Sequence, residues 1–183
     1  VLRDNSDIID ILISEKDDSV YEALNKAISY AEGEYVSILH SDDHYESKNV
    51  LELIHNNLNK NKIDVLFASA TYFKKGKYHQ PVRKYESTDF KPDLIKYGFM
   101  PPHTSMFSKK SVYSAIGFFN TKYKIAADFD WLLKLYSKNE FSIHYIKENV
   151  INMNTQGLSN PNIFNIFRKL QIHNELFYIF KDN

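Results

Sequence analysis

The 183 residues of this chain suit one compact domain, which is long enough to bury an apolar core without disulfides or a structural metal. Lysine plus arginine and aspartate plus glutamate number 23 each, so the overall charge favours neither nucleic acid nor an acidic surface as a partner. The absence of cysteine excludes disulfides and thiol chemistry. No apolar run approaches the ~18 residues that span a bilayer, and the first residues do not resemble a signal peptide, so we expect a cytoplasmic protein.

The first half of the chain alternates between strand and helix periodicity. Ile8–Ile13 is short, apolar and β-branched, which predicts a buried strand. From Ser19, which forms a capping box with the glutamate three residues on, the apolar positions follow helical spacing. Residues 35–39 predict a second strand, Ser47 can cap a second helix, and residues 63–73 predict a strand buried on both faces. Strands joined by helices in this way predict an α/β fold with a mostly parallel sheet flanked by helices.

The second half is less regular. A basic, turn-rich segment at 74–87 predicts a solvated hairpin, and without a basic domain or a known binding fold it does not indicate nucleic-acid binding. The other predicted elements are an extended segment, two helices, two strands and a terminal helix, at residues 101–108, 109–116, 127–137, 141–146, 150–153 and 162–181.

The predicted terminal helix has a broad apolar face that needs a partner. The simplest expectation is that this face packs on the domain, so that residues 1–160 form the domain and residues 161–183 form an amphipathic helix packed on it or at an interface. A homodimer contact, or contact with the inner face of a membrane that carries a lipid-linked acceptor, is the alternative.

The stretch YVSILHSDDHY, residues 35–45, leads a strand directly into Asp42 and Asp43. In open α/β sheets ligands bind at the carboxyl ends of the strands, where these two carboxylates fall. Adjacent aspartates repel one another, so a divalent cation such as Mg²⁺ or Mn²⁺ is the natural partner that keeps both ionised. The alternative is a turn whose carboxylates only cap the backbone N–H groups of the next helix.

The segment SEKDDSVYEALNKAISYAEGEYVSILHSDDHY resembles family 2 glycosyltransferases, which typically read S-E-x-D-x-G-I-Y-D-A-x-N-K-G-I, then A-x-G-D-Y-I, then an apolar strand ending in S-D-D. Farther on, IGFFNTKYKIAADFDWLLKL resembles the family's G-x-F-D-x-x-Y-K-x-x-x-D-Y-D-x-x-L-R-L, and GLS at 157–159 resembles its G-G-x-S loop. In the first segment the matching positions are Ser14, Glu15, Asp17, Tyr21, Ala23, Asn25, Lys26, Ala31, Gly33, Tyr35, Ser41, Asp42 and Asp43.

This resemblance implies a GT-A type fold that binds a nucleotide-diphosphate sugar with Mg²⁺ or Mn²⁺. Asp43 matches the direct metal ligand, Asp42 matches the contact to the ribose or donor sugar, and Asp128 matches the general base. In an inverting transfer the base takes the proton of an acceptor hydroxyl while that oxygen attacks the anomeric carbon. Asp130 lies two residues on, about 200° away around the helix, which favours a structural role.

Other matched residues are candidates for the donor and acceptor sides. Asp17, Asn25 and Lys26 are expected to contact the diphosphate or nucleotide, although a solvated helix face also explains the last two. His103 falls where the family places acceptor-side residues, and Trp131 could stack on an acceptor sugar or anchor its helix in the core.

His40 and His44 bracket the paired carboxylates. An imidazole there could complete a metal shell, but a histidine beside a turn is more often only hydrogen-bonded, so neither is assigned as a ligand.

The resemblance therefore implies an inverting glycosyltransferase that acts on a glycan or lipid-linked acceptor, and we expect a role in bacterial surface polysaccharide synthesis. The family usually begins with a strand like I-x-I-P-T-Y-N, a helix, and a strand ending in D-D-G-S, which hold the nucleotide base. The first strand of this chain corresponds to the family's third, so we expect an N-terminally truncated GT-A domain. The alternative is a catalytically inactive remnant or fragment that serves as a binding or interaction module.

Overall fold

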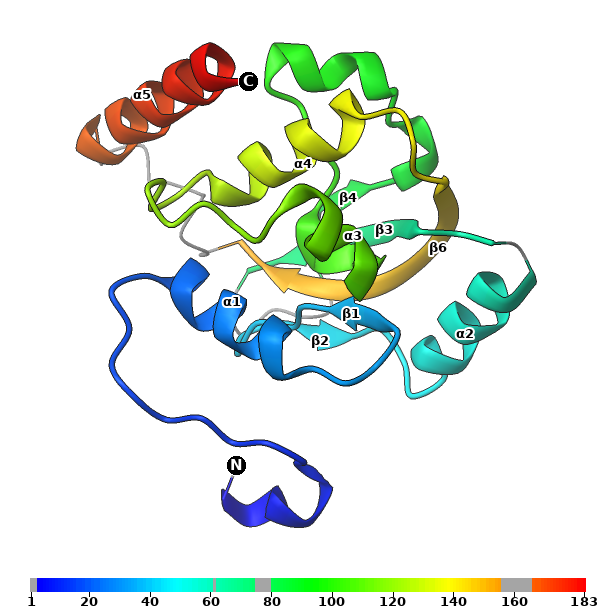
Figure 1. Ribbon diagram of the computed structural model, residues 1–183. Coiled ribbons are helices and arrows are strands. Elements are labelled where there is room, and N and C mark those ends of the chain that lie inside the picture. Colours follow the sequence, from blue (N-terminus) through cyan, green and yellow to red (C-terminus); the bar gives the residue numbers. More distant parts are fainter. Residues whose placement is uncertain (1–2, 61, 75–79, 156–165) are drawn as a thin grey trace.

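A six-stranded sheet with helices on both faces organises the chain (Figure 1). The structure is a computed structural model that describes residues 3–60, 62–74, 80–155 and 166–183. Its α-helices are α1 (Val20–Tyr30), α2 (Val50–Lys60), α3 (Lys110–Ile116), α4 (Ala127–Ser137) and α5 (Ile166–Asp182). Short 3₁₀ helices are η1 (Arg3–Ile8), η2 (Ser87–Asp89), η3 (Pro92–Tyr97) and η4 (His103–Ser105). The strands are β1 (Tyr35–Ser37), β2 (His44–Tyr45), β3 (Val65–Phe73), β4 (Pro81–Tyr85), β5 (Met106–Lys109) and β6 (Ile143–Asn154).

The strand order β1-β5-β3-β6-β2, with β4 also paired to β3, confirms an α/β fold but corrects the prediction of a mostly parallel sheet. Among the described strands only the β3–β6 pairing is parallel, and the other four pairings are antiparallel. The helix-linked strands β1 and β3 do run in the same direction. However, β5, which follows η4 in the sequence, lies between them and pairs antiparallel with both.

The two faces of the sheet bury separate apolar clusters. Along β3, Val65 and Phe67 belong to the cluster under α1, α3 and α4, while Leu66, Ala68 and Ala70 belong to the cluster under α2. This alternation follows from the two-residue period of a strand, and it explains why β3 is buried on both sides, as its sequence predicts.

Ile8–Ile13 is not the buried strand that its composition predicts. The segment leaves η1 and runs without sheet pairing beside α1, and the side chains of Ile11, Leu12 and Ile13 stay roughly half exposed. Figure 1 shows it apart from the sheet. Strand propensity alone is insufficient here because a strand needs a neighbouring ladder to satisfy its N–H and C=O groups, and no described strand lies beside this segment.

Two further predictions about the second half need correction. The strands expected at 141–146 and 150–153 are one strand, β6, whose pairing with β3 shifts register between Tyr145 and Asn149. The polar residues at 147 and 148 sit in this irregularity with exposed side chains, so polarity marks a bulge instead of a strand end. The extended segment expected at 101–108 is the helical turn η4 followed by β5.

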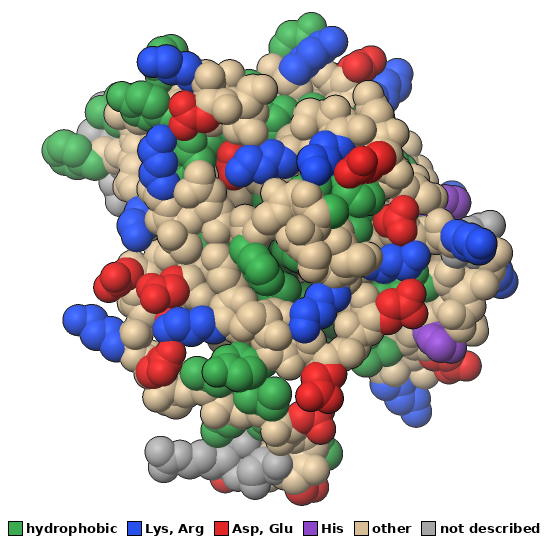
Figure 2. Space-filling model, in the orientation of Figure 1, with side chains coloured by type: hydrophobic (Ala, Val, Ile, Leu, Met, Phe, Trp, Pro, Cys, Tyr) green, Lys and Arg blue, Asp and Glu red, His purple; other side chains and the backbone are tan. Residues whose placement is uncertain are grey.

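The described part of the basic segment confirms the predicted hairpin, since β4 pairs antiparallel with β3 and its residues are exposed or half-buried. Figure 2 shows charges of both signs intermingled on one face of the molecule.

The C-terminal helix α5 contacts the body at one end and leaves much of its apolar surface exposed. Ile179 is fully buried, whereas Phe167, Leu170 and Phe177 are more than half exposed, and apolar side chains gather over α5 in Figure 2. Residues 156–165, which include the predicted boundary at 160 and the GLS motif, lie outside the described residues. Dimer or membrane contact through this helix stays a prediction. None of the described helices combines the length and apolar character that crossing a membrane requires.

Candidate functional site

The turn after β1 places the paired carboxylates at the edge of the sheet. The N–H of Asp43 donates to the carbonyl of His40 at 3.1 Å, which closes the turn through the backbone. Oδ1 of Asp43 accepts the N–H of Asn154 at the end of β6, also at 3.1 Å. Asp43 is therefore half-buried and tied to the sheet instead of capping the following helix, while Asp42 stays exposed. Burial, reinforced by the Asp42 carboxylate, raises the pKa of Asp43 against the opposing effect of that N–H.

Sheet topology brings a second segment to this turn. Because β5 is antiparallel to β1, with Ser37 opposite Phe107, the residues after β1 meet the residues before β5. Nε2 of His40 consequently lies 3.1 Å from Nε2 of His103 in η4, with the rings nearly perpendicular.

The same histidine connects the turn to α4. Nδ1 of His103 lies 2.9 Å from Oδ2 of Asp128, and the side chains are only 17% and 6% exposed. Oδ1 of Asp128 lies 3.1 Å from the hydroxyl of Tyr21 and 2.9 Å from the backbone N of Phe129. His40, His103 and Asp128 therefore form one hydrogen-bonded chain from the turn to the buried start of α4.

The electrostatics of this chain differ from one end to the other. Burial alone would lower the pKa of His103, but the adjacent Asp128 carboxylate raises it above its ordinary value. Burial would raise the pKa of Asp128, but the His103 imidazole, with N–H and O–H donors, holds it below its ordinary value. Burial and the neighbouring His103 lower the pKa of His40. A proton added to the pair of rings is therefore favoured on His103.

The start of α4, which carries Asp128, is capped from α5. The residue at the N-cap position, Ala126, makes no side-chain capping hydrogen bond. The Glu175 carboxylate accepts three N–H groups there, from Lys124 at 3.0 Å, Ile125 at 3.0 Å and Ala126 at 2.9 Å. A carboxylate at this end also complements the helix dipole. The sequence signal for this contact is weak, because Glu175 lies 49 residues from the nearest N–H that it binds.

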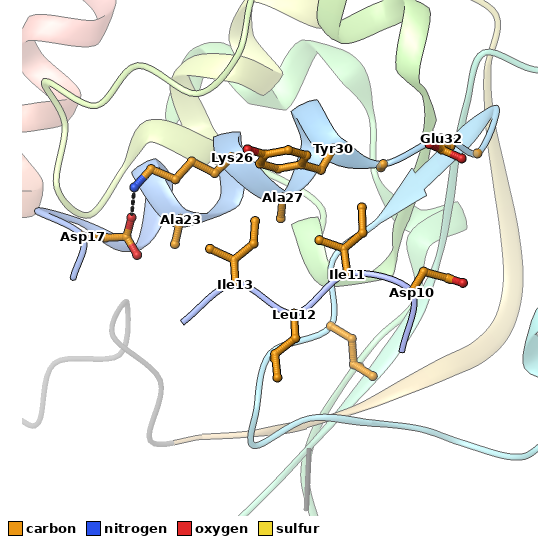
Figure 3. Close-up of a pocket in the computed structure, with 13 residues that line it drawn as sticks. Asp10, Ile11, Leu12, Ile13, Asp17, Ala23, Lys26, Ala27, Tyr30 and Glu32 are labelled. Carbon is orange, nitrogen blue, oxygen red and sulfur yellow. Dashed lines mark hydrogen bonds and ion pairs between the residues drawn. The ribbon is translucent and has the colours of Figure 1, made fainter. Parts of the chain in front are cut away.

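The predicted donor-side residues separate into two groups. Nζ of Lys26 is 2.7 Å from Asp17 and 2.6 Å from Glu15, and Lys26 and Asp17 line a pocket of about 1010 Å³ between α1 and residues 10–13 (Figure 3). Leu39 also lines it, so the pocket adjoins the turn that follows β1. Asn25 instead holds the backbone of Phe119 through two hydrogen bonds, which is a structural arrangement.

Trp131 lies in the core, with 1% of its surface exposed. Its ring packs against that of Tyr113 with a tilt of 31° and 4.6 Å between centroids, and Nε1 donates to the carbonyl of Gly117 at 2.9 Å. These contacts agree with the second predicted role of Trp131, in which it anchors its helix in the core. Asp130 is buried beside Lys134, at 2.7 Å, and accepts from Asn183, in agreement with a structural role.

The turn fits a cation that is shared with a bound diphosphate. In the described ranges no group of three or more His, Cys, Asp or Glu side chains could by itself hold a metal. Mg²⁺, however, commonly takes one or two carboxylates and completes its shell with substrate phosphates and water. The raised pKa of Asp43 indicates a carboxylate that the protein compensates poorly, which suits such a role.

Comparison with known proteins supports the fold. The model of the family described as Glycosyl transferase family 2 matches residues 2–115. No curated protein matches the sequence significantly. A crystal structure of S. aureus TarS 1-349 superposes with a TM-score of 0.65 at 17% identity, covering 84% of this chain and 46% of TarS. The same TarS fragment in complex with UDP-GlcNAc gives 0.60 at 18% identity, covering 79% and 41%. The complex with UDP gives 0.53 at 18% identity, covering 74% and 40%. This chain thus spans less than half of those TarS chains, and at such identity the likeness shows the fold alone.

Proposed function

The chain belongs to glycosyl transferase family 2, and we propose that it transfers a sugar from a nucleotide-diphosphate donor to an acceptor hydroxyl with inversion at the anomeric carbon. The acceptor is a glycan or a lipid-linked saccharide in the assembly of a bacterial surface polysaccharide. An inactive remnant that only binds a partner is the competing function.

One observation carries the proposal. The hydrogen bonds that join His40, His103 and Asp128 put an acid–base group beside the turn after β1. This turn presents Asp42 and Asp43. A transfer that expels a diphosphate needs both: positive charge held near the leaving group, and a group that takes the proton of the acceptor hydroxyl. Residues 40–43 and 128 are far apart in sequence, so their convergence is not a consequence of local structure.

The donor side is proposed to run from the turn toward the pocket lined by Asp17 and Lys26. Lys26 is paired with Asp17 and Glu15, so it would face a phosphate after exchanging one of these carboxylates for it. Asp42 is exposed where a ribose or sugar hydroxyl could donate to it. The TarS complexes contain UDP and UDP-GlcNAc, which supports a uridine-diphosphate sugar as the first donor to test.

Asp43 would hold Mg²⁺ or Mn²⁺. When bound, such a cation acts as a Lewis acid that stabilises the negative charge of the leaving diphosphate. Asp43 is suited to hold it because the hydrogen bond from Asn154 fixes one carboxylate oxygen and leaves the second for a ligand.

The test is a screen of UDP-, GDP- and dTDP-sugars for nucleotide release by the full chain, with Mn²⁺ and then with excess EDTA. We expect release from at least one donor, loss of release in EDTA, and binding of UDP with Mn²⁺ by calorimetry. Absence of both heat and release would reject the transferase and favour the inactive module.

A further inference from the structure

The β3–β4 hairpin is connected to the candidate site through one row of residues across the sheet (Figure 1). Tyr72 in β3 lies opposite Arg83 in β4 on one side and opposite Met153 in β6 on the other. The residue after Met153, Asn154, donates its N–H to Oδ1 of Asp43 at 3.1 Å. Arg83 therefore lies two strands from the backbone group that holds the predicted metal ligand.

A second contact connects the same row to the acid–base part of the site. Sδ of Met153 lies 3.0 Å from Oγ1 of Thr104, the residue that follows His103 in η4. His103 in turn holds Asp128 at 2.9 Å. The row is thus tied both to the turn with the paired carboxylates and to the segment that holds the predicted base, so a long side chain on it can extend toward both.

Arg83 is exposed, and its charge is not used by a carboxylate of the described residues. Lys26 is paired with Asp17, whereas no ion pair in the described ranges involves Arg83. Its Cζ lies 5.7 Å from the centre of the Tyr72 ring. A guanidinium that lies over an aromatic ring keeps its N–H groups available at its edge for oxygen ligands.

The Tyr72 hydroxyl lies between charges of opposite sign. Burial raises its pKa, the Arg83 guanidinium lowers it, and the Asp43 carboxylate raises it. The net pKa is above the ordinary value, so the hydroxyl stays protonated near neutral pH and can donate a hydrogen bond. An oxyanion that contacts a metal ion at Asp43 on one side and the guanidinium on the other would match this arrangement of charges.

We propose that Arg83 is a catalytic residue whose guanidinium binds the diphosphate of the donor, and that the Tyr72 hydroxyl is a second hydrogen-bond donor to the same group. This inference rests on the proposed glycosyl transfer. In that step the acceptor oxygen bonds to the anomeric carbon, and its proton passes to the base predicted at Asp128. The bond from the anomeric carbon to the diphosphate breaks, and the diphosphate keeps the electron pair and gains a negative charge. A fixed guanidinium stabilises this charge without changing its own protonation.

Calorimetry with pyrophosphate and Mn²⁺ tests the binding without any sugar transfer. We expect Arg83→Gln to raise the Kd of pyrophosphate about 10- to 100-fold, because a charge-assisted contact is lost. Arg83→Lys should raise it less, since lysine keeps the charge but not the planar fork.

Lys84→Gln is the matched control for this measurement. It removes the same charge from the next position of β4, which is exposed and, by the alternation of a strand, points to the other face. This variant should keep the Kd of the wild type. A wild type that does not bind pyrophosphate, or an Arg83→Gln variant that binds it as tightly as Lys84→Gln, would overturn the inference.

Kinetics of nucleotide release separate the diphosphate from the acceptor as the group that Arg83 contacts. With the donor selected by the screen and water as acceptor, Arg83→Gln should lower kcat/KM about 100-fold. Unchanged kcat/KM with water, together with a higher KM for a saccharide acceptor, would place Arg83 at the acceptor and overturn the assignment. A wild type that releases no nucleotide but loses pyrophosphate affinity in Arg83→Gln would reject the transferase and retain the diphosphate site.

Discussion

Oε2 of Glu175 lies 2.9 Å from the backbone nitrogen of Ala126, one residue before α4 begins. Through this contact, α5 fixes the end of the helix that carries Asp128. The C-terminal helix therefore contributes to the geometry of the candidate site although none of its own side chains enters the chain of His40, His103 and Asp128.

Replacing Glu175 by alanine should destabilise the protein by about 1–2 kcal/mol, because three N–H groups lose their acceptor and the helix dipole loses its compensating charge. Thermal unfolding should show a Tm lower by roughly 2–8 °C. His173→Ala, an exposed position on the same helix, controls for the loss of helix side chains. Equal Tm values for the two variants would contradict the capping role.

Asp43→Asn should remove Mn²⁺ binding in the presence of UDP without destabilising the protein alone. Asparagine can still accept the N–H of Asn154, and burial already disfavours the charge of Asp43. We expect an unchanged or slightly higher Tm without metal, with the metal-dependent heat lost in calorimetry. Asp93→Asn, whose side chain is 94% exposed, is the matched control. Retention of Mn²⁺ binding by Asp43→Asn would show that another residue holds the cation.

The elements with local signals were predictable from sequence. Ser19 does accept the N–H of Glu22 at the start of α1, and the helix expected at 127–137 is α4 with those bounds. The apolar run of β3 likewise predicts its burial on both faces. In each case the determining contacts lie within a few residues, or depend on side-chain period alone.

The parts that could not be predicted depend on contacts distant in sequence. The insertion of β5 between β1 and β3 leaves no mark on the apolar pattern of any of the three strands. That insertion also brings His40 to His103, so the hydrogen-bonded chain of the site follows from the sheet topology and not from a sequence motif. Ile8–Ile13 shows the converse case, in which strand propensity is present and a partner ladder is absent from the described residues.

The ion pair of His103 and Asp128 should make stability depend on pH. The raised pKa of His103 stabilises the folded state fully below the ordinary value of 6.5, and this contribution falls as pH rises through the folded pKa. The lowered pKa of Asp128 contributes above the ordinary value of 3.8 and is lost as pH falls through the folded pKa. The pair should therefore stabilise most between these two values.

His40 opposes this trend, because its lowered pKa destabilises the folded state at acid pH. The contribution of His103 is therefore measured in a background without His40, as the difference in the free energy of unfolding between His40→Gln and the double variant His40→Gln, His103→Gln. Urea unfolding at pH 5 and pH 8.5 should show a larger difference in the free energy of unfolding at pH 5. The remaining charged neighbour of His103, Asp43, is the same in both proteins. A difference that is equal or larger at pH 8.5 would argue against the ion pair.

Trp131 should prove to be a structural residue and not an acceptor contact. Its indole fills the core between α3 and α4, so Trp131→Phe, which loses the bond to Gly117 and part of the ring volume, should cost about 1–2 kcal/mol of stability. Trp131→Ala should cost about 3–5 kcal/mol and deplete the folded protein. Sugar transfer by the phenylalanine variant, measured well below its Tm, should keep the kcat and acceptor KM of the wild type, because a residue that is 1% exposed has no free face for a sugar. A selective rise in acceptor KM with unchanged Tm would instead place the indole at the acceptor site and require the helix to move when the acceptor binds.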